Sequence, residues 1–188
     1  MASKFYGSTV LKDINLNRGA RLLLTDGPLR LGWRHSGITS DFIAEVMSMP
    51  YVSAKDQYTL VHHSIGYLTN ELIENAVKFR LPAAVEIEAS LEATYFFLRV
   101  RNPIDAETSL VFQRKLDDML DGDPSELLIL QIEANALSQS SGSGLGILTL
   151  LSDYGARIMW EFDDDDENGV MLTTTAAVAV PVASNYVS

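Results

Sequence analysis

The chain contains no cysteine among its 188 residues. This absence excludes disulfides, cysteine-ligated zinc, iron–sulfur clusters and thiol catalysis. Basic residues are scarce as well: 14 Lys and Arg stand against 25 Asp and Glu, which gives a formal net charge of −11 at pH 7. Affinity for duplex DNA or for an anionic membrane comes from clustered Lys and Arg. We therefore expect neither nucleic acid nor a membrane as a partner.

Long apolar runs are also missing. The longest weakly charged stretch, residues 170–182, is too short to span a bilayer and predicts a β-strand instead. The first seven residues lack the apolar core of a signal peptide. With 47% hydrophobic and 21% charged residues, the composition is that of an ordinary globular domain. We expect a soluble, cytoplasmic protein.

The strongest secondary-structure signal lies in residues 55–79. Five apolar residues recur there at steps of three and four and form the single stripe of a helix with one buried face. They are Ile65, Leu68, Leu72, Ala76 and Phe79. Pro82 ends this predicted helix.

The other elements alternate between strand and helix. Around the turn residues 26–28, residues 20–34 predict a hairpin, followed by a short helix at 40–47. Pro103 is expected to end the second of two middle strands. The predicted strands are 84–90, 93–101, 156–162 and 170–182, and the later helices are 105–120, 125–137 and 145–154. Residues 138–144 predict a flexible loop, and the acidic residues 163–168 a hairpin loop.

Three polar residues line one side of the long predicted helix, away from its apolar stripe. Glu71, Asn75 and Lys78 stand at positions i, i+4 and i+7. Glu71 can accept a proton, the Asn75 side-chain oxygen is a ligand that suits Mg²⁺, and Lys78 can meet a phosphate. The same row also fits an ordinary solvated helix face.

A glycine-rich segment precedes the predicted helix at 145–154. Gly142, Gly144 and Gly146 allow a close backbone approach, and the exposed N–H groups at a helix start favour an anion. The segment is not a Walker A loop, because no Gly-Lys-Ser/Thr follows, and no strand leads into it as in a dinucleotide-binding fingerprint. Alone, it equally fits a plain linker.

Together, the two segments resemble the GHKL ATPase superfamily. The residues that carry the resemblance are Glu-x-x-x-Asn-Ala-x-Lys-Phe at 71–79 and Gly-x-Gly-Leu-Gly-Ile at 142–147. The resemblance covers roughly residues 55–182, most of the chain, and implies an α/β, two-layer sandwich, with a mixed, mostly antiparallel sheet and helices on one face. It makes 55–188 an ATP-binding domain and 1–54 an N-terminal extension packed on it.

The resemblance also assigns roles to single residues. Glu71 matches the catalytic base, Asn75 the Mg²⁺ ligand and Lys78 a phosphate contact. Gly142, Gly144 and Gly146 match the glycine box where a lid meets the phosphates of ATP. Thr174 matches a threonine that helps to hold the adenine. The implied cofactors are ATP and Mg²⁺, and residues 105–137 would form a lid of two helices.

One part of the family pattern is absent. Where such proteins carry Asp-x-Gly-x-Gly, this chain reads Val-Arg-Asn-Pro-Ile-Asp at 100–105. Asn102 stands at the position of the Asp that accepts a hydrogen bond from adenine, and its side-chain oxygen can also accept one. Asp105 is a second candidate for this role.

The resemblance implies a stand-alone kinase of the anti-sigma-factor or switch-protein kind. Its activity would be γ-phosphoryl transfer to a serine or threonine of a partner regulator, with a homodimer possible. A degraded GHKL-fold interaction module, with weak or no nucleotide binding, is the alternative. A hydrolase that uses ATP to time lid closure is a third.

Two further motifs carry less chemistry. The acidic run 163–167 begins like a calcium loop, but Thr175 stands where that loop needs a bidentate Glu. His62 and His63 point about 100° apart on a helix, so they cannot easily clamp one metal ion. We expect a solvated hairpin tip and two helix-surface or core-edge histidines.

Overall fold

The computed structural model describes residues 3–16, 19–25, 32–138, 144–165 and 169–183. Its strands form one sheet in the order β1-β5-β6-β4-β3-β2, and every pairing between neighbours is antiparallel. The strands are β1 (Lys4–Gly7), β2 (Gly19–Leu24), β3 (Val85–Leu91), β4 (Tyr95–Ile104), β5 (Arg157–Asp165) and β6 (Gly169–Ala179). The expected mixed sheet is thus antiparallel throughout its described strands.

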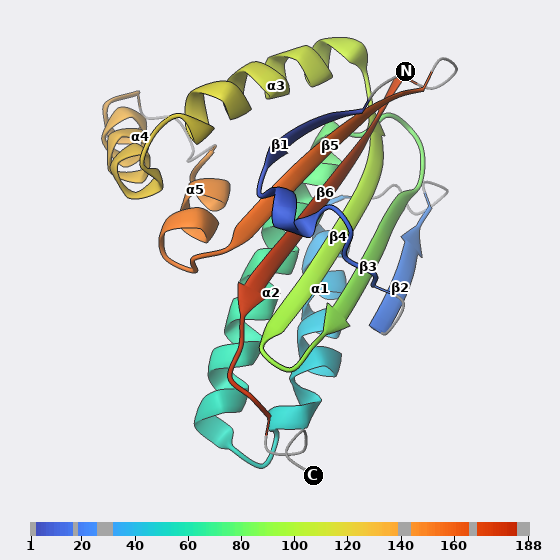
Figure 1. Cartoon of the computed structure of the whole chain (residues 1–188), viewed down its shortest axis with the longest axis vertical. Coiled ribbons are helices and arrows are strands. Elements are labelled where there is room, and N and C mark those ends of the chain that lie inside the picture. Colours follow the sequence, from blue (N-terminus) through green and yellow to red (C-terminus); the bar gives the residue numbers. More distant parts are fainter. Residues whose placement is uncertain (1–2, 17–18, 26–31, 139–143, 166–168, 184–188) are drawn as a thin grey trace.

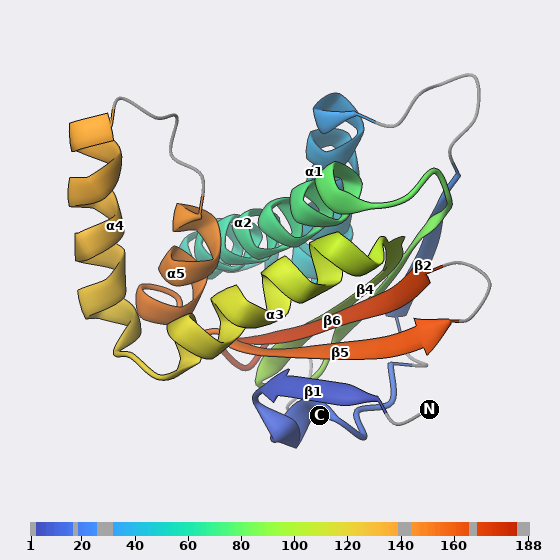
Figure 2. The same cartoon turned by 90° about the horizontal axis from the view of Figure 1, so that it is seen from above.

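The helices gather on one side of this sheet (Figure 2). They are α1 (Trp33–Ser48), α2 (Lys55–Phe79), α3 (Ala106–Leu120), α4 (Pro124–Ser138) and α5 (Leu145–Ser152). Of two short 3-10 helices, η1 (Thr9–Leu11) follows β1, and η2 (Met49–Tyr51) lies between α1 and α2. This arrangement fits the expected two-layer α/β sandwich, in which the buried faces of helices and sheet form one core. Of the described helices, none has both the length and the apolar character needed to cross a membrane.

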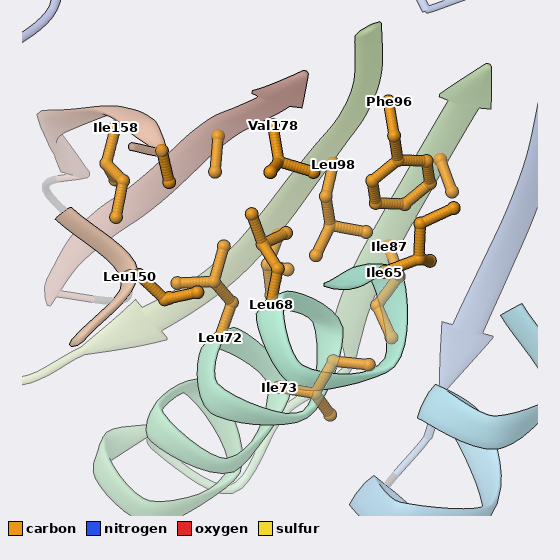
Figure 3. Close-up of a cluster of buried hydrophobic side chains, with 14 of the residues drawn as sticks. Ile65, Leu68, Leu72, Ile73, Ile87, Phe96, Leu98, Leu150, Ile158 and Val178 are labelled. Carbon is orange, nitrogen blue, oxygen red and sulfur yellow. The ribbon is translucent and has the colours of Figure 1, made fainter. Parts of the chain in front are cut away.

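The helix α2 has the bounds that its apolar period predicts. Ile65, Leu68 and Ile73 are fully buried against the sheet. Figure 3 shows them with Ile87 and Leu98 of the sheet. Each such side chain contributes about 1.5–3 kcal/mol on burial, so this face fixes how α2 lies on the sheet.

The hairpin expected at residues 20–34 is wrong. β2 pairs with β3, with Leu22 opposite Ile87, and Trp33 begins α1 instead of ending a strand. α1 is also longer than the predicted helix at 40–47. The turn signal is local, whereas the partner that β2 needs for its backbone groups lies far along the chain.

The N-terminal residues contribute to the same sheet. Tyr6 of β1 lies opposite Trp160 of β5, a pairing that the polar N-terminal sequence did not predict. β1 and β2 thus form the two edges of the sheet (Figure 1). Residues 1–54 supply both edge strands and α1 to one shared core.

The strand β4 does not end before Pro103. Pro103 stays in register opposite Met171, and β4 continues to Ile104. Proline lacks the N–H of a ladder, but the pairing with β3 already stops at Arg101, so no ladder bond is lost. The Pro103 carbonyl instead accepts a hydrogen bond from the Leu81 N–H at 2.8 Å.

The C-terminal half largely follows the prediction. α3, α4 and α5 lie within a few residues of their expected positions, although α5 ends at Ser152 with Asp153 as its C-cap, before the predicted end at residue 154. β5 runs on through Asp163 to Asp165, so the acidic loop expected at 163–168 is wrong in its first half. Residues 166–168 lie outside the described residues.

Candidate functional site

Glu71 lies where α2 meets the beginning of α5. A Cβ atom added to Gly146 would overlap with the Glu71 carboxylate and would lie 3.2 Å from its Cγ. The absence of a side chain at Gly146 is therefore what lets the carboxylate approach the α5 backbone this closely. The helical row and the glycine segment, far apart in the sequence, come together at this point.

The surroundings of Glu71 favour its protonated form. Its side chain is half-buried, and this burial raises the pKa of Glu71. The nearby Glu74 carboxylate raises the pKa further, because two like charges disfavour each other. A carboxyl group with a raised pKa is suited to accept and release a proton nearer to neutral pH.

Asn75 and Lys78 follow Glu71 along the same flank of α2. Asn75 is partly buried, whereas Lys78 is exposed near the end of the helix. The Lys78 Nζ lies 5.0 Å from the centre of the Phe79 ring, which is an internal cation–π contact. The structure thus brings Glu71 to the glycine segment, whereas Lys78 lies in solvent near the C-terminal end of α2.

Asn102 and Thr174 are both buried on the sheet face that the helices cover. Thr174 of β6 lies opposite Val100 of β4, and Asn102 is two residues further on the same face. The Asn102 Nδ2 has no hydrogen-bond partner among the described residues, although Asn102 is only 2% exposed. An unpaired buried donor costs about 1–3 kcal/mol, so this amide is a candidate for binding an acceptor.

Asp105, the second candidate for the adenine contact, is engaged elsewhere. It caps α3 by accepting hydrogen bonds from the Thr108 N–H at 2.7 Å and the Thr108 hydroxyl at 2.8 Å. These bonds lower the pKa of Asp105 and hold its carboxylate at the helix start, where it is exposed. The Asp105 carboxylate is therefore already used as the N-cap of α3.

The three glycines of the predicted phosphate loop differ in their setting. Gly144 caps the start of α5 with a φ of +97°, a conformation that other residues rarely adopt. Gly146 is the residue that contacts Glu71. Gly142 lies outside the described residues.

An aromatic clamp, missed in the sequence, holds α5 against α2. The rings of Tyr67 and Tyr154 stack at 5.0 Å with an 8° angle between their planes. The Tyr154 hydroxyl and His63 Nε2 share a hydrogen bond at 3.0 Å. Burial raises the pKa of Tyr67, which also bonds to the side chain of Thr149 in α5. Tyr67 lies one turn before Glu71 on the same flank, and that spacing is the signal that could have found it.

Apolar contacts beneath this clamp place α5 over the core. Leu150 is fully buried, and Figure 3 shows it beside Leu72 of α2 and Ile158 of β5. Two contacts therefore hold Gly146 against Glu71: the packing of Leu150 into the core, and the stacking of Tyr67 on Tyr154.

Two other features bear on ligands. A cavity of about 400 Å³ opens between the turn after β1, the ends of α3 and α5 and the start of β5, and none of the predicted site residues lines it. Over the described ranges, no group of three or more His, Cys, Asp or Glu could hold a metal ion. A metal ion at Asn75 would therefore need ligands from a bound molecule as well.

Comparisons with family models, with curated proteins and with solved structures find no match in any of the three.

Proposed function

We propose that this chain is a cytoplasmic GHKL-type protein that binds ATP and Mg²⁺ where α2 meets the start of α5. Its activity would be transfer of the γ-phosphoryl group to a serine or threonine of a partner regulator, in a bacterial partner-switching or signalling pathway. The observation that carries the proposal is the contact between the Glu71 carboxylate and Gly146. It joins a proton acceptor to a helix start, which is where an anion binds most readily.

The side chains of this region suit this role. The Asn75 side-chain oxygen is a hard donor, which suits Mg²⁺ shared with phosphates, and Asn75 would hold the ion. When bound, Mg²⁺ neutralises charge on the phosphates. The α5 N–H groups after Gly144 and the Lys78 ammonium would face the remaining phosphate charge. Asn102 and Thr174 would contact the base.

In the proposed reaction, Glu71 takes the proton of the attacking hydroxyl. The partner's hydroxyl oxygen forms a bond to the γ-phosphorus, and the bond between that phosphorus and the β–γ bridging oxygen breaks. ADP leaves with the bridging oxygen, and the partner keeps the phosphoryl group. Such a transfer depends mostly on positioning and electrostatics, so few side chains suffice.

A second candidate is an interaction module with this fold and weak or no nucleotide binding. The observation that favours it is the path of the chain after β4. Pro103 and Ile104 extend the strand, and Asp105 then caps α3, so no glycine-rich turn opens the sheet beside Asn102.

Titration with Mg-ATP separates the two candidates. If ATP reaches a concentration of about 100 times its Kd, binding stabilises the native state by about 2.7 kcal/mol. For a chain of this size that corresponds to a rise in Tm of about 5–11 °C. The absence of a shift at millimolar Mg-ATP would favour the interaction module.

Variants on α2 locate the site. Asn75→Ala should weaken Mg-ATP binding in calorimetry, whereas Glu71→Ala should leave binding nearly intact and abolish turnover. Asn70→Ala is the matched control, because Asn70 lies on the same helix and its amide bonds to Glu74 at 3.1 Å. Equal binding in the wild type, Asn75→Ala and Asn70→Ala would contradict the assignment of Asn75.

A further inference from the structure

The helix α1 carries a second apolar stripe on the side that faces away from the core. Ile38, Phe42, Val46 and Met49 follow one another at steps of four, four and three, with Met49 at the helix C-cap. Their exposed fractions are 71%, 51%, 37% and 62%. At 100° per residue, the stripe lies about 160° from the centre of the face that α1 buries.

The inner face of α1 is already packed. Ile43, Ala44 and Met47 belong to the main hydrophobic core, and α1 lies along α2 and over β3. A single exposed apolar residue needs no explanation, but a stripe in helical register has the form of a packing face. α1 thus has one face for its own core and one that the described chain does not cover.

The charges beside the stripe are mostly acidic: Arg34 lies one turn before Ile38, and the charged residues that follow it along α1 are carboxylates. Between residues 36 and 54 the sequence has no Lys, Arg or His, and its charged residues are Asp41 and Glu45. Both are exposed on α1. Glu45 accepts a hydrogen bond from the Tyr58 hydroxyl at 2.6 Å, and His62 Nε2 lies 3.5 Å from it, so α2 holds this carboxylate beside the stripe.

This charge pattern discriminates between possible occupants. If two copies paired their α1 helices about a two-fold axis, Asp41 and Glu45 would face the same acidic residues of the other copy, which is unfavourable. An anionic lipid surface would be repelled as well. A helix with Lys or Arg along its apolar face would gain both apolar burial and opposite charge.

We propose that the outer face of α1 is a docking surface for an amphipathic helix of a partner protein, with basic residues beside its apolar stripe. α1 and α5 lie on opposite sides of α2 (Figure 2), so this surface is separate from the Glu71 region. Docking there needs no nucleotide, and the inference does not depend on the proposed ATP site.

Two designed helical peptides test the proposal on the full chain without nucleotide. Both peptides have about 18 residues, enough to cover the apolar stripe of α1, and both carry the same row of leucines along one face. The basic peptide has Lys and Arg beside these leucines, and the acidic peptide has Glu there. Calorimetry should find the basic peptide bound about tenfold or more tightly than the acidic one. The double change Asp41→Lys with Glu45→Lys should reverse this preference. Equal affinity for both peptides would overturn the proposal.

Single variants show whether the stripe itself binds. Phe42→Ser should weaken the basic peptide by about tenfold or more, as expected for an aromatic anchor. Leu130→Ser, at an equally exposed apolar residue of α4, should change nothing. Met49→Ser replaces Phe42→Ser if that variant unfolds. An equal loss in the α4 variant would refute the stripe as the site.

The other occupants have their own readouts. In sedimentation, the chain alone should not self-associate through the stripe, so Phe42→Ser should leave its sedimentation unchanged. Vesicles with anionic lipid should not bind the chain through the stripe. Either result, self-association or vesicle binding lost in Phe42→Ser, would replace the proposed partner by a second copy or a membrane.

Discussion

The contact between Glu71 and Gly146 can be tested by replacing Gly146 with alanine. In a helix, Gly→Ala alone stabilises by up to about 1 kcal/mol. At Gly146, however, the new Cβ overlaps with the Glu71 carboxylate and lies 3.2 Å from Cγ, so the side chain must move. The overlapping atoms are the end of a flexible, half-buried side chain that can turn away, so the cost lies at or below the low end of the roughly 1–3 kcal/mol typical of overpacking, about 1 kcal/mol. We therefore expect Gly146→Ala to be close to neutral in the wild type, because the cost of moving Glu71 offsets the helix gain.

The same change should become more favourable once Glu71 is shortened. In the Glu71→Ala background the overlap is gone, and Gly146→Ala should be stabilising. Urea unfolding of the four proteins gives the free energy of unfolding of each, and the double-mutant cycle isolates the coupling. We expect a coupling of about 1 kcal/mol.

A matched control comes from α1. A Cβ on Gly37 meets no described atom within 4 Å, so Gly37→Ala should stabilise by about 0.5–1 kcal/mol in both backgrounds. If the effects of Gly146→Ala and Glu71→Ala add within about 0.5 kcal/mol, the two residues are not in contact and the reasoning fails.

Three further outcomes are expected. Because the pKa of Glu71 is raised in the folded state, ionisation of Glu71 lowers the free energy of unfolding as pH rises from the ordinary carboxyl range through the raised pKa. Urea unfolding should therefore find Glu71→Gln more stable than the wild type at pH 7, and this difference should disappear toward pH 4. Phe112 makes edge contacts with Trp160 and Phe162, and Phe112→Ala should cost about 3 kcal/mol in the same assay, whereas a change below 1 kcal/mol would mean that α3 does not cover this face. The Tyr51 hydroxyl donates to the Pro181 carbonyl at 2.7 Å, so Tyr51→Phe should cost about 1 kcal/mol and speed hydrogen exchange after Val180; an unchanged exchange rate would contradict this tether.

The sequence predicts the elements whose signals are local. α2 is found at its observed bounds because one apolar stripe dominates its period, and Asp105 marks the real start of α3. α1 is found only in part. Its second stripe, at Ile38, Phe42 and Val46, places apolar residues on both faces and blurs the period that would have extended the prediction.

The errors lie where distant residues decide. The pairing of β2 with β3 depends on a strand far along the chain, and β4 passes Pro103 only because β3 has already ended. In the site, the spacing of Glu71 and Asn75 on one flank was visible from the sequence. The closeness of Gly146 and the stacking of Tyr67 on Tyr154 were not, because tertiary packing of α5 creates them.

Hydrogen exchange with and without Mg-ATP tests most directly whether α2 and the start of α5 form one triphosphate site. We predict that Mg-ATP slows amide exchange both in residues 71–79 and in residues 144–150, and leaves the outer turns of α1 unchanged. Protection of only one of these two segments, or none at saturating Mg-ATP, would contradict the proposal.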